Sequence, residues 1–506
     1  MIIFVINLKS PVSINEYIKF EKHYPNANLI FVYNGDSFRE CDLVAFLDKV
    51  TCQYKRIDTI FYLNPIANTS LWEDARGIFF LMKSVIQAQL DAVNILAAGF
   101  FENDIQRCHL ESWVGIGRTT GIILPHCSVK IVGIEKTEDH MEQWIDILCN
   151  EWRNAGSKSA IYKSGKRFTS HIREISIEEK PGTLLKHEEV YMVTGGLGGI
   201  GYIISRFLLT EYDAKLILIN RSSLNKYQDR YNELLKISPN IIYIQADICN
   251  LEQMEKGMQE IKKIYNRIDG VIHAAGLEGS KSIMEETLEE YQDILQPKIQ
   301  GTIILDEVLK DYAPDFICYF SSTAAILGDF GNCAYSVGNR FLMAYADNDF
   351  NDSKVSNISI KKLVINWPLW NSTGIGSDDK ERCLMYLGSS GQQYLEAEEG
   401  GQIFHSLIGQ KRAQHIVMKG NHANVCRILK INHSEEKDRI AIKNEAEESL
   451  IEVNTKAGIN GTIEKCLDWD LKRMISSFLK LEMENIEREN NLIEYGFDSI
   501  SLANFS

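Results

Sequence analysis

The stretch Val190–Gly201 reads VYMVTGGLGGIG and decides the fold of this chain. Its first four residues form an apolar run typical of a buried strand, and its glycines stand where a strand would turn into a helix. Glycine at such a turn permits a tight bend, close backbone approach to a pyrophosphate and close packing of helix on strand. The free N–H groups of the helix start attract phosphate. The residues that we expect to form this dinucleotide-binding turn are Thr194, Gly195, Gly196, Leu197, Gly198, Gly199, Ile200 and Gly201.

Downstream of this turn, apolar runs and helical stretches alternate. The helical stretches include Gly199–Leu209 and Met284–Leu295. Strict alternation of strand and helix implies a parallel sheet that is covered by helices on both faces. The runs that we expect to form its further strands are Leu216–Asn220, Ile241–Gln245, Gly270–His273, Phe316–Phe320 and Lys362–Asn366.

Residues 1–185 show the same alternation, but no glycine-rich turn follows their first apolar run, Ile2–Asn7. Nothing in this part can therefore cradle a phosphate. We predict an α/β fold with two Rossmann-like subdomains: a degenerate structural one without cofactor at residues 1–185, and a catalytic, cofactor-binding one at residues 186–430. The other elements expected in the first subdomain are the strands Leu29–Tyr33, Thr59–Leu63, Ala92–Ala98 and Val129–Ile134 and the helix Phe79–Leu90.

The ends of the strands in the second subdomain favour NADPH as the cofactor. Arg221 follows the second strand, where an acidic residue would bind the ribose of NAD and an arginine accommodates the 2′-phosphate of NADPH. A surface arginine without this role is the alternative. His273 ends the fourth strand, and we expect it to be packed and hydrogen-bonded instead of catalytic. The other residues expected at the cofactor are Ser222, Asp247, Ile248, Ala274, Ala275 and Gly276, which follow the second, third and fourth strands.

Reduction of a ketone needs a proton donor as well as a hydride donor, and four downstream residues suit this chemistry. Tyr335 and Asn339 have the spacing that places them on one face of a helix, in adjacent turns. Ser322 ends the preceding strand and could polarise a carbonyl by a hydrogen bond. A tyrosine has an ordinary pKa of about 10, so a nearby cation would help it to act near neutral pH. Lys298 is the candidate cation. Each residue type is common on protein surfaces, and it is their joint order behind the glycine turn that favours a site.

In this order the residues resemble the ketoreductase domains of modular polyketide synthases, which are members of the short-chain dehydrogenase/reductase superfamily. Those domains carry Tyr-xxx-Asn, with the lysine supplied from upstream. Here Lys298 lies 37 residues before Tyr335, and Ser322 lies 13 residues before it. The resemblance implies that Tyr335 is the proton donor, Ser322 the carbonyl partner, Lys298 the cation that lowers the pKa of the phenol, and Asn339 the residue that completes the proton relay.

The resemblance covers nearly the whole chain and implies a function. Ser112–Arg118 and Tyr162–Phe168 look like stretches of the family's structural subdomain, and Asn366–Trp370 resembles the lid region of ketoreductases from trans-acyltransferase synthases. The implied activity is the NADPH-dependent reduction of a β-ketoacyl thioester on a carrier protein, among neighbouring synthase domains. Leu277–Ser280 reads LEGS where one stereochemical class carries Leu-Asp-Asp, and Leu327 stands where the other class carries Trp. The configuration of the alcohol stays open, and the missing aspartate favours the L-hydroxy product.

The C-terminal part is expected to contain a linker and part of a further domain. Residues 431–465 are charged and poor in aromatic side chains, which is typical of a solvated linker. Residues 466–506 resemble the start of an acyl carrier protein, because Gly496–Ile500 (GFDSI) is similar to the site that receives 4′-phosphopantetheine. The resemblance implies that Ser499 is modified in a longer native protein, and a helix-capping serine is the alternative. So short a segment is not expected to fold stably alone.

The overall composition restricts the partners and the compartment. A net charge of −15 argues against nucleic acid or an anionic membrane as partner. The 11 cysteines show no metal-ligand spacing, so we expect reduced thiols in a cytoplasmic protein and no metal. No apolar stretch approaches the roughly 20 residues that span a bilayer. Two other functions stay open, namely a free-standing dehydrogenase or epimerase of the same superfamily, and an inactive ketoreductase-like scaffold.

Overall fold

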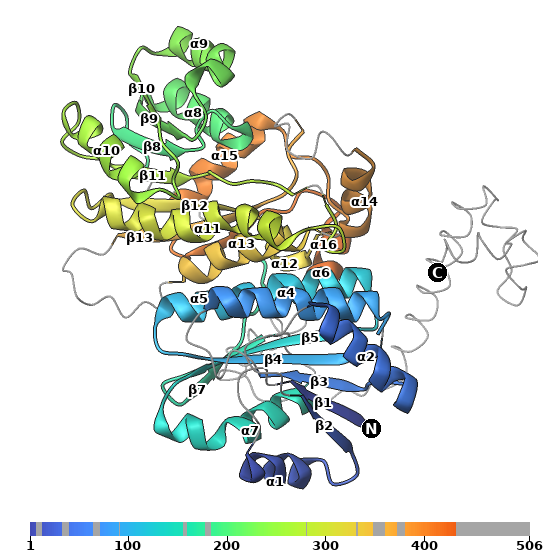
Figure 1. Ribbon diagram of the computed structural model, residues 1–506. Helices are drawn as coiled ribbons and strands as arrows, with labels where there is room; N and C mark the ends of the chain where they lie inside the picture. The colour runs from blue at the N-terminus through green and yellow to red at the C-terminus, as the bar shows by residue number, and fades with distance from the viewer. Residues whose placement is uncertain are drawn as a thin grey trace, which may run out of the picture. The chain divides into compact units, whose positions relative to one another are not determined.

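A computed structural model describes residues 1–6, 13–32, 40–63, 71–90, 92–154, 159–177, 184–279, 281–329, 332–347, 360–371 and 380–431 (Figure 1). The chain divides by its contacts into two units, residues 1–431 and residues 432–506. The predicted linker, except for Ile431, and the predicted carrier segment with Ser499 lie outside the described residues. No helix within the described part is long and apolar enough to cross a membrane.

The second half of the first unit is built on a seven-stranded sheet in the order β10-β9-β8-β11-β12-β13-β14, and all its neighbouring strands are parallel. The strand order reverses between β8 and β11, so that their carboxyl ends flank a crevice of the kind in which nucleotides bind. The five strands predicted downstream of the turn are confirmed within two residues at each end. The strands are β8 (Val190–Thr194), β9 (Lys215–Asn220), β10 (Ile241–Gln245), β11 (Gly270–His273), β12 (Phe316–Ser322), β13 (Lys361–Trp367) and β14 (Gln414–Ile416).

Helices cover both faces of this sheet, as the alternation predicted. Helices α8, α9 and α15 pack on one face, and α10, α11 and α13 pack on the other (Figure 1). The predicted start of one of these helices was wrong: α11 begins at Leu288 and not at Met284, because Thr287 and Glu290 form a capping box there. The helices are α8 (Gly199–Tyr212), the 3-10 turn η2 (Leu224–Tyr227), α9 (Gln228–Ile237), α10 (Leu251–Lys262), α11 (Leu288–Leu309), α12 (Ala324–Leu327), α13 (Cys333–Tyr345), α14 (Lys380–Ser390), α15 (Ala397–Ile408) and α16 (His422–Leu429).

The first half contains a second seven-stranded sheet in the order β2-β1-β3-β4-β5-β6-β7, parallel except for β7. The predicted strands are all present, and β6 and β7 form a hairpin that the periodicity did not show. The strands are β1 (Ile2–Ile6), β2 (Asn28–Val32), β3 (Thr59–Tyr62), β4 (Asn94–Phe101), β5 (Ser128–Glu135), β6 (Ser159–Lys163) and β7 (Lys166–Phe168). The helices are α1 (Ile14–His23), α2 (Glu40–Tyr54), α4 (Leu71–Gln87), α5 (Asp104–Ser112), α6 (Val114–Ile123) and α7 (Glu138–Arg153).

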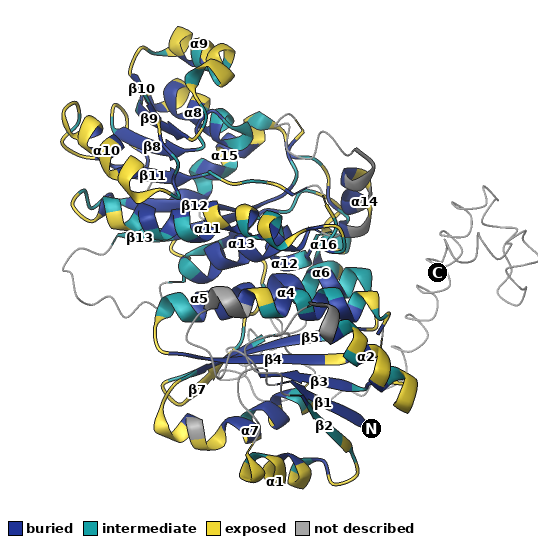
Figure 2. Ribbon diagram, viewed as in Figure 1, coloured by how far each residue is buried: buried dark blue, intermediate teal, exposed yellow. Residues whose placement is uncertain are grey.

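The two halves share a hydrophobic core. Helices α4, α5 and α6 of the first half lie against α11, α12 and α13 of the second (Figure 1), and the side chains along this seam are buried (Figure 2). The rings of Phe79 and Tyr291 meet across it, with centroids 4.5 Å apart. The first half therefore forms the support against which the α13 helix is held. The other buried side chains of this core include Leu110, Trp113, Ile116, Val337 and Phe341.

Candidate active site

The glycine turn between β8 and α8 has the tight geometry that the sequence predicts. Gly195 has a φ of +70°, and a Cβ there would lie 2.9 Å from the backbone of Ala275. A Cβ on Gly201 would lie 2.2 Å from the Gly195 carbonyl oxygen. Only glycine leaves the backbone bare at these two places, so the turn presents main-chain N–H groups at the start of α8.

The turn is tied to the neighbouring strand ends by hydrogen bonds. The Ala274 amide donates to the Thr194 carbonyl at 3.1 Å, and the Leu197 amide donates to Asn220 Oδ1 at 3.3 Å. His273 Nδ1 lies 2.7 Å from the Thr194 hydroxyl, and burial lowers the pKa of this histidine to about 3. His273 is thus a neutral, packed residue that braces the crevice, as expected from the sequence.

The residues predicted to bind the cofactor follow the carboxyl ends of neighbouring strands in this sheet. Arg221 follows the last residue of β9 and is exposed, and no acidic residue stands at that strand end. The Asp247 carboxylate, two residues beyond β10, accepts a hydrogen bond of 2.9 Å from the Cys249 amide. Ala275 and Gly276 continue from β11 as small residues beside the glycine turn. Because parallel strands end at one edge, all these groups lie around the crevice between β8 and β11.

The four residues predicted to carry out the proton chemistry converge. Ser322 is the last residue of β12, and its Oγ accepts a hydrogen bond of 3.2 Å from the Ala324 amide. Tyr335 lies in the first turn of α13, where its own amide donates to Asn332 Oδ1 at 3.1 Å. The ammonium nitrogen of Lys298, from the middle of α11, lies 5.8 Å from the centroid of the Tyr335 ring.

The environment of Tyr335 keeps the phenol protonated. Burial raises its pKa most, and the negative charge of Glu278 raises it further, whereas hydrogen bonding by Ser322 and Asn339 lowers it. The net direction is upward from the ordinary value. The sequence led us to expect a lowered pKa for this phenol, but in this structure burial moves it in the opposite direction.

Lys298 is held rigidly behind the phenol. Its side chain is 5% exposed, and Nζ donates to the Phe320 carbonyl at 3.2 Å. A Cβ on Gly276 would lie 3.3 Å from Nζ, and a Cβ on Gly338 would lie 3.2 Å from Cδ, so glycines make room for the lysine on two sides. Burial lowers the pKa of Lys298 to about 7.

Asn339 stabilises the helix behind Tyr335. Its Nδ2 donates to the main-chain carbonyl of Tyr335 at 2.8 Å, and the main-chain carbonyl of Asn339 accepts a hydrogen bond of 3.1 Å from the Ser321 hydroxyl. Asn339 Oδ1 is buried without a hydrogen-bond partner among the described residues. The side chain thus links two turns of α13 and retains one free acceptor for a proton donor.

An open cavity adjoins Ser322 and Tyr335. The segment Trp367–Trp370, predicted to belong to a lid region, forms part of its wall. The sequence analysis assigned no role to Glu278, although it had noted the surrounding LEGS, or to Tyr386 on α14, whose hydroxyl lies 2.8 Å from that of Thr323. The one available signal was the position of Glu278 two residues after Gly276, in the segment that follows β11. The lining residues also include Ile200, Ser321, Ala324, Asp329 and Cys383.

The fold of this half is an α/β fold of the Rossmann type, with Tyr335 and the buried Lys298 close together beside the carboxyl ends of β8 and β11. Residues 189–372 match the family model described as the KR domain. This part of the chain is therefore similar to the KR domain.

Individual relatives agree with this assignment. The chain is 37% identical over 452 residues to the polyketide synthase PksM of Bacillus subtilis, covering 89% of this chain and 10% of that protein. It is 33% identical over 294 residues to the polyketide synthase ThaG of Burkholderia thailandensis, covering 56% of this chain and 5% of that protein. The chain therefore spans a small part of the length of these relatives.

A solved structure shares the fold. The crystal structure of a ketoreductase domain from the bacillaene assembly line superposes with a TM-score of 0.66 at 22% sequence identity. The match covers 85% of this chain and 94% of that chain. Because nearly all of that chain is matched, both sheets belong to the shared architecture.

Proposed function

We propose that this chain reduces the ketone of a carrier-bound β-ketoacyl thioester to the corresponding β-hydroxyacyl thioester, with NADPH as reductant. The observation that carries the proposal is the convergence of Ser322 and Tyr335 on one cavity, with the Lys298 ammonium 5.8 Å behind the phenol ring. A ketone oxygen in this cavity would meet a hydroxyl that can polarise it and a phenol that can protonate it.

The glycine turn and Arg221 are the groups that would hold NADPH. The bare backbone at Gly195 and Gly201 leaves room for a pyrophosphate, and the start of α8 supplies N–H donors to it. Arg221, at the end of β9, suits the 2′-phosphate that distinguishes NADPH from NADH. When bound, NADPH supplies the hydride for the carbonyl carbon.

Three residues have different roles toward the ketone oxygen of the substrate. Ser322 donates a hydrogen bond to the carbonyl oxygen and so prepares it to accept negative charge. Tyr335, whose raised pKa keeps it protonated, gives its proton to the alkoxide as that charge develops. Lys298 and the hydrogen bonds from Ser322 and Asn339 then stabilise the phenolate until a proton returns to it.

The substrate is proposed to arrive on an acyl carrier protein, because the relatives are polyketide synthases and the chain covers a small part of each. In this proposal residues 466–506 belong to a carrier domain, Ser499 bears the phosphopantetheine arm, and residues 431–465 are the connecting linker. The structural subdomain at residues 1–185 and the catalytic subdomain at residues 186–430 then form one reductase unit among neighbouring synthase domains. The configuration of the alcohol would be determined by chiral analysis of the product.

Replacing one phenol hydroxyl tests the proposal. Tyr335→Phe should lower NADPH oxidation on a β-ketoacyl thioester mimic by roughly 10²–10⁴-fold, because the proton donor is lost. NADPH affinity should be unchanged. Tyr345→Phe is the matched control, because it removes a hydroxyl from the same helix where that group bonds Asp306 at 2.6 Å. Full turnover by Tyr335→Phe, or no turnover by the unaltered chain, would refute the assignment.

A further inference from the structure

Three side chains with metal-binding atoms meet away from the active site. Glu174 lies on the extended segment that leaves the first half of the chain, and His422 and Cys426 lie on α16. His422 Nε2 lies 3.1 Å from both carboxylate oxygens of Glu174 and 3.6 Å from Cys426 Sγ. All three ligand atoms lie within 4.8 Å of one another.

The distances match the edges of a metal coordination tetrahedron. Zinc binds histidine nitrogen and carboxylate oxygen at about 2.0 Å and thiolate sulfur at about 2.3 Å. For tetrahedral ligands these bond lengths require N···O and N···S separations of about 3.3 Å and 3.6 Å. The N···O and N···S separations of this cluster are thus close to those around one small ion, the third separation is within 4.8 Å, and the three atoms are ligand types that zinc prefers.

The fold preorganises the cluster. His422 and Cys426 are four residues apart in a helix, which places both on one face. Asn421 caps that helix through a hydrogen bond of 3.1 Å from the Asn424 amide to its side chain. Cys426 is 7% exposed, whereas Glu174 and His422 are exposed, so the sulfur forms the floor of the cluster and solvent can reach the ion and supply a fourth ligand.

The position of the cluster connects it to the cavity wall. Helix α16 packs against α14, and a Cβ on Gly391, the residue after α14, would lie 3.0 Å from Asn424 Cβ. Cys383 and Tyr386 of α14 line the cavity of the active site. A metal that links Glu174 to α16 would therefore restrain α16, against which the cavity-lining helix α14 packs.

We propose that Glu174, His422 and Cys426 bind a divalent transition metal, zinc by its ligand preference, with water in the fourth position. Binding forms the metal–sulfur, metal–nitrogen and metal–oxygen bonds, releases the thiol proton and any proton on His422 Nε2 to solvent, and changes no oxidation state. The sequence analysis expected no metal site because the cysteines show no recognised metal-ligand spacing. Glu174 joins them only through the fold, 248 residues away.

Cobalt titration of the complete 506-residue chain tests the proposal, after removal of metals by a chelator. Cobalt(II) should bind with about one equivalent and give the charge-transfer absorption of a cobalt–thiolate bond together with tetrahedral d–d bands. Cys426→Ser should abolish the charge-transfer band, and His422→Asn should weaken cobalt binding at least about tenfold, as loss of a ligand requires. Cys52→Ser, which removes an exposed thiol from α2, should leave the spectrum unchanged.

Thermal unfolding provides a second measurement that does not depend on the Cys426 variant folding normally. Zinc should raise the melting temperature of the unaltered chain, and Glu174→Gln should remove most of this rise. The proposal is wrong if cobalt gives no thiolate band, if Cys426→Ser retains the band, or if zinc raises the melting temperatures of the unaltered chain and Glu174→Gln equally. None of these measurements involves NADPH oxidation, so they are independent of the proposed reductase activity.

Discussion

The two halves of the first unit have closely related sheets and differ where each sheet begins. In the second half, β8 leads into the glycine turn and then into α8. In the first half, β1 is followed by Asn7–Val12, a stretch that contains no glycine. Both halves have a largely parallel sheet packed against helices, but only the second has a run of glycines after its first strand. A shared architecture therefore does not imply a shared function.

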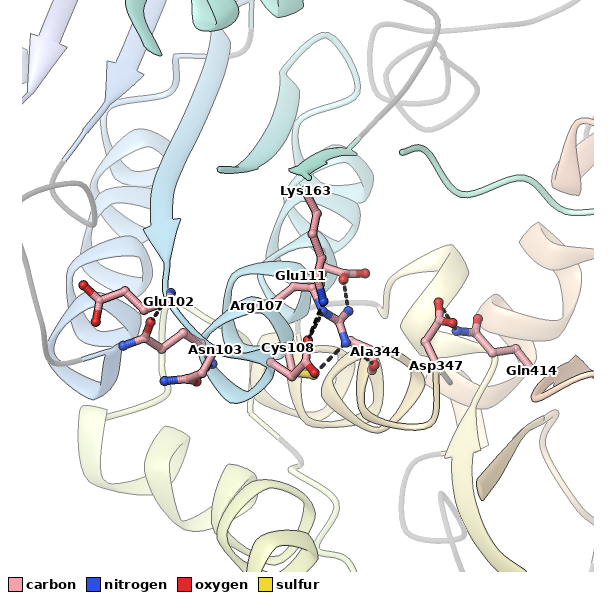
Figure 3. Close-up of polar contacts among 11 residues, drawn as sticks. Glu102, Asn103, Arg107, Cys108, Glu111, Lys163, Ala344, Asp347 and Gln414 are labelled. Carbon is pink, nitrogen blue, oxygen red and sulfur yellow. Dashed lines mark hydrogen bonds and ion pairs between the residues drawn. The ribbon is translucent and has the colours of Figure 1, made fainter. Parts of the chain in front are cut away.

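The first half contributes contacts that hold α13, the helix that carries Tyr335. Figure 3 shows Arg107 of α5 between Glu111 and the Ala344 carbonyl at the end of α13. Arg107 Nη1 donates to Glu111 at 2.5 Å and Nη2 donates to Ala344 at 3.2 Å. Near the other end of α13, the Thr119 hydroxyl donates to Ser336 at 3.3 Å. The helix that carries Tyr335 is thus held by the first half along its length.

Removing the Arg107 contact should have the largest effect on stability. Arg107→Met leaves the Glu111 carboxylate and the Ala344 carbonyl without their buried partner, which should cost about 3–5 kcal/mol of unfolding free energy. Urea unfolding of the complete chain measures this cost. The double variant Arg107→Met/Glu111→Leu removes both charges and should recover part of it. If Arg107→Met is as stable as the unaltered chain, the first half does not support α13 through this residue.

Adding a side chain to the glycine turn should have the next largest effect, and this effect should be on the binding of NADPH. Gly201→Ala places a methyl carbon 2.2 Å from the Gly195 carbonyl oxygen. This separation is far below van der Waals contact, so the turn must distort. If the overpacking cost of about 1–3 kcal/mol is expressed in binding, the dissociation constant of NADPH rises by roughly 5- to 150-fold. Fluorescence titration with NADPH measures it, and circular dichroism checks that the fold persists. An unchanged dissociation constant would show that this turn does not hold the cofactor.

A glycine of the first half should affect the rate and not cofactor binding. A Cβ on Gly115 in α6 would lie 2.7 Å from the Ser336 carbonyl carbon, so Gly115→Ala should displace the helix that carries Tyr335. We expect kcat to fall by roughly 10-fold, because small displacements of catalytic groups slow reactions strongly, while the dissociation constant of NADPH stays the same.

The same helix provides the control for Gly115→Ala. A Cβ on Gly121 meets no heavy atom within 4 Å, so Gly121→Ala should leave kcat unchanged. Equal rates for the two variants would contradict a role of the first half in placing Tyr335.

The smallest effect is expected from a buried carboxyl where the halves meet. Glu286 is 1% exposed, and neither oxygen of its carboxyl group has a hydrogen-bond partner among the described residues. The Lys83 ammonium of the first half donates to the main-chain carbonyl of Glu286 at 3.2 Å. Burial, and then the charge of Glu290, raise the pKa of Glu286 to about 8. Since the unfolded carboxyl loses its proton at lower pH than the folded one, Glu286 should reduce stability progressively as pH rises from about 4.5 to 8.

A neutral side chain at this position should remove the pH dependence. Glu286→Gln should raise the melting temperature at pH 8 by about 1–3 °C and by clearly less at pH 5.5, since about 1 kcal/mol shifts the melting temperature of a chain this large by about 1 °C. The exposed Glu289→Gln is the matched control and should show no such difference. A gain that is equal at both pH values would contradict the raised pKa.

The amino-acid sequence by itself determined the two sheets, the glycine turn and the positions of Ser322, Tyr335 and Asn339. Each depends on residues that are neighbours in the chain: apolar runs form strands, glycines form the turn, and a four-residue spacing places two side chains on one helix face. The strand ends carrying Arg221 and Asp247 follow from the same local pattern, because parallel strands end at one edge. Their roles toward NADPH stay predictions.

Only the tertiary structure decided how these pieces act on one another. It placed Lys298 behind the Tyr335 ring, added Glu278 and Tyr386 to the cavity, and brought Glu174 to His422 and Cys426. It also reversed the expected direction of the Tyr335 pKa, because the burial of a phenol depends on everything that packs around it. Periodicity reports which face of an element is buried, whereas contacts between distant segments arise from packing that no local pattern contains.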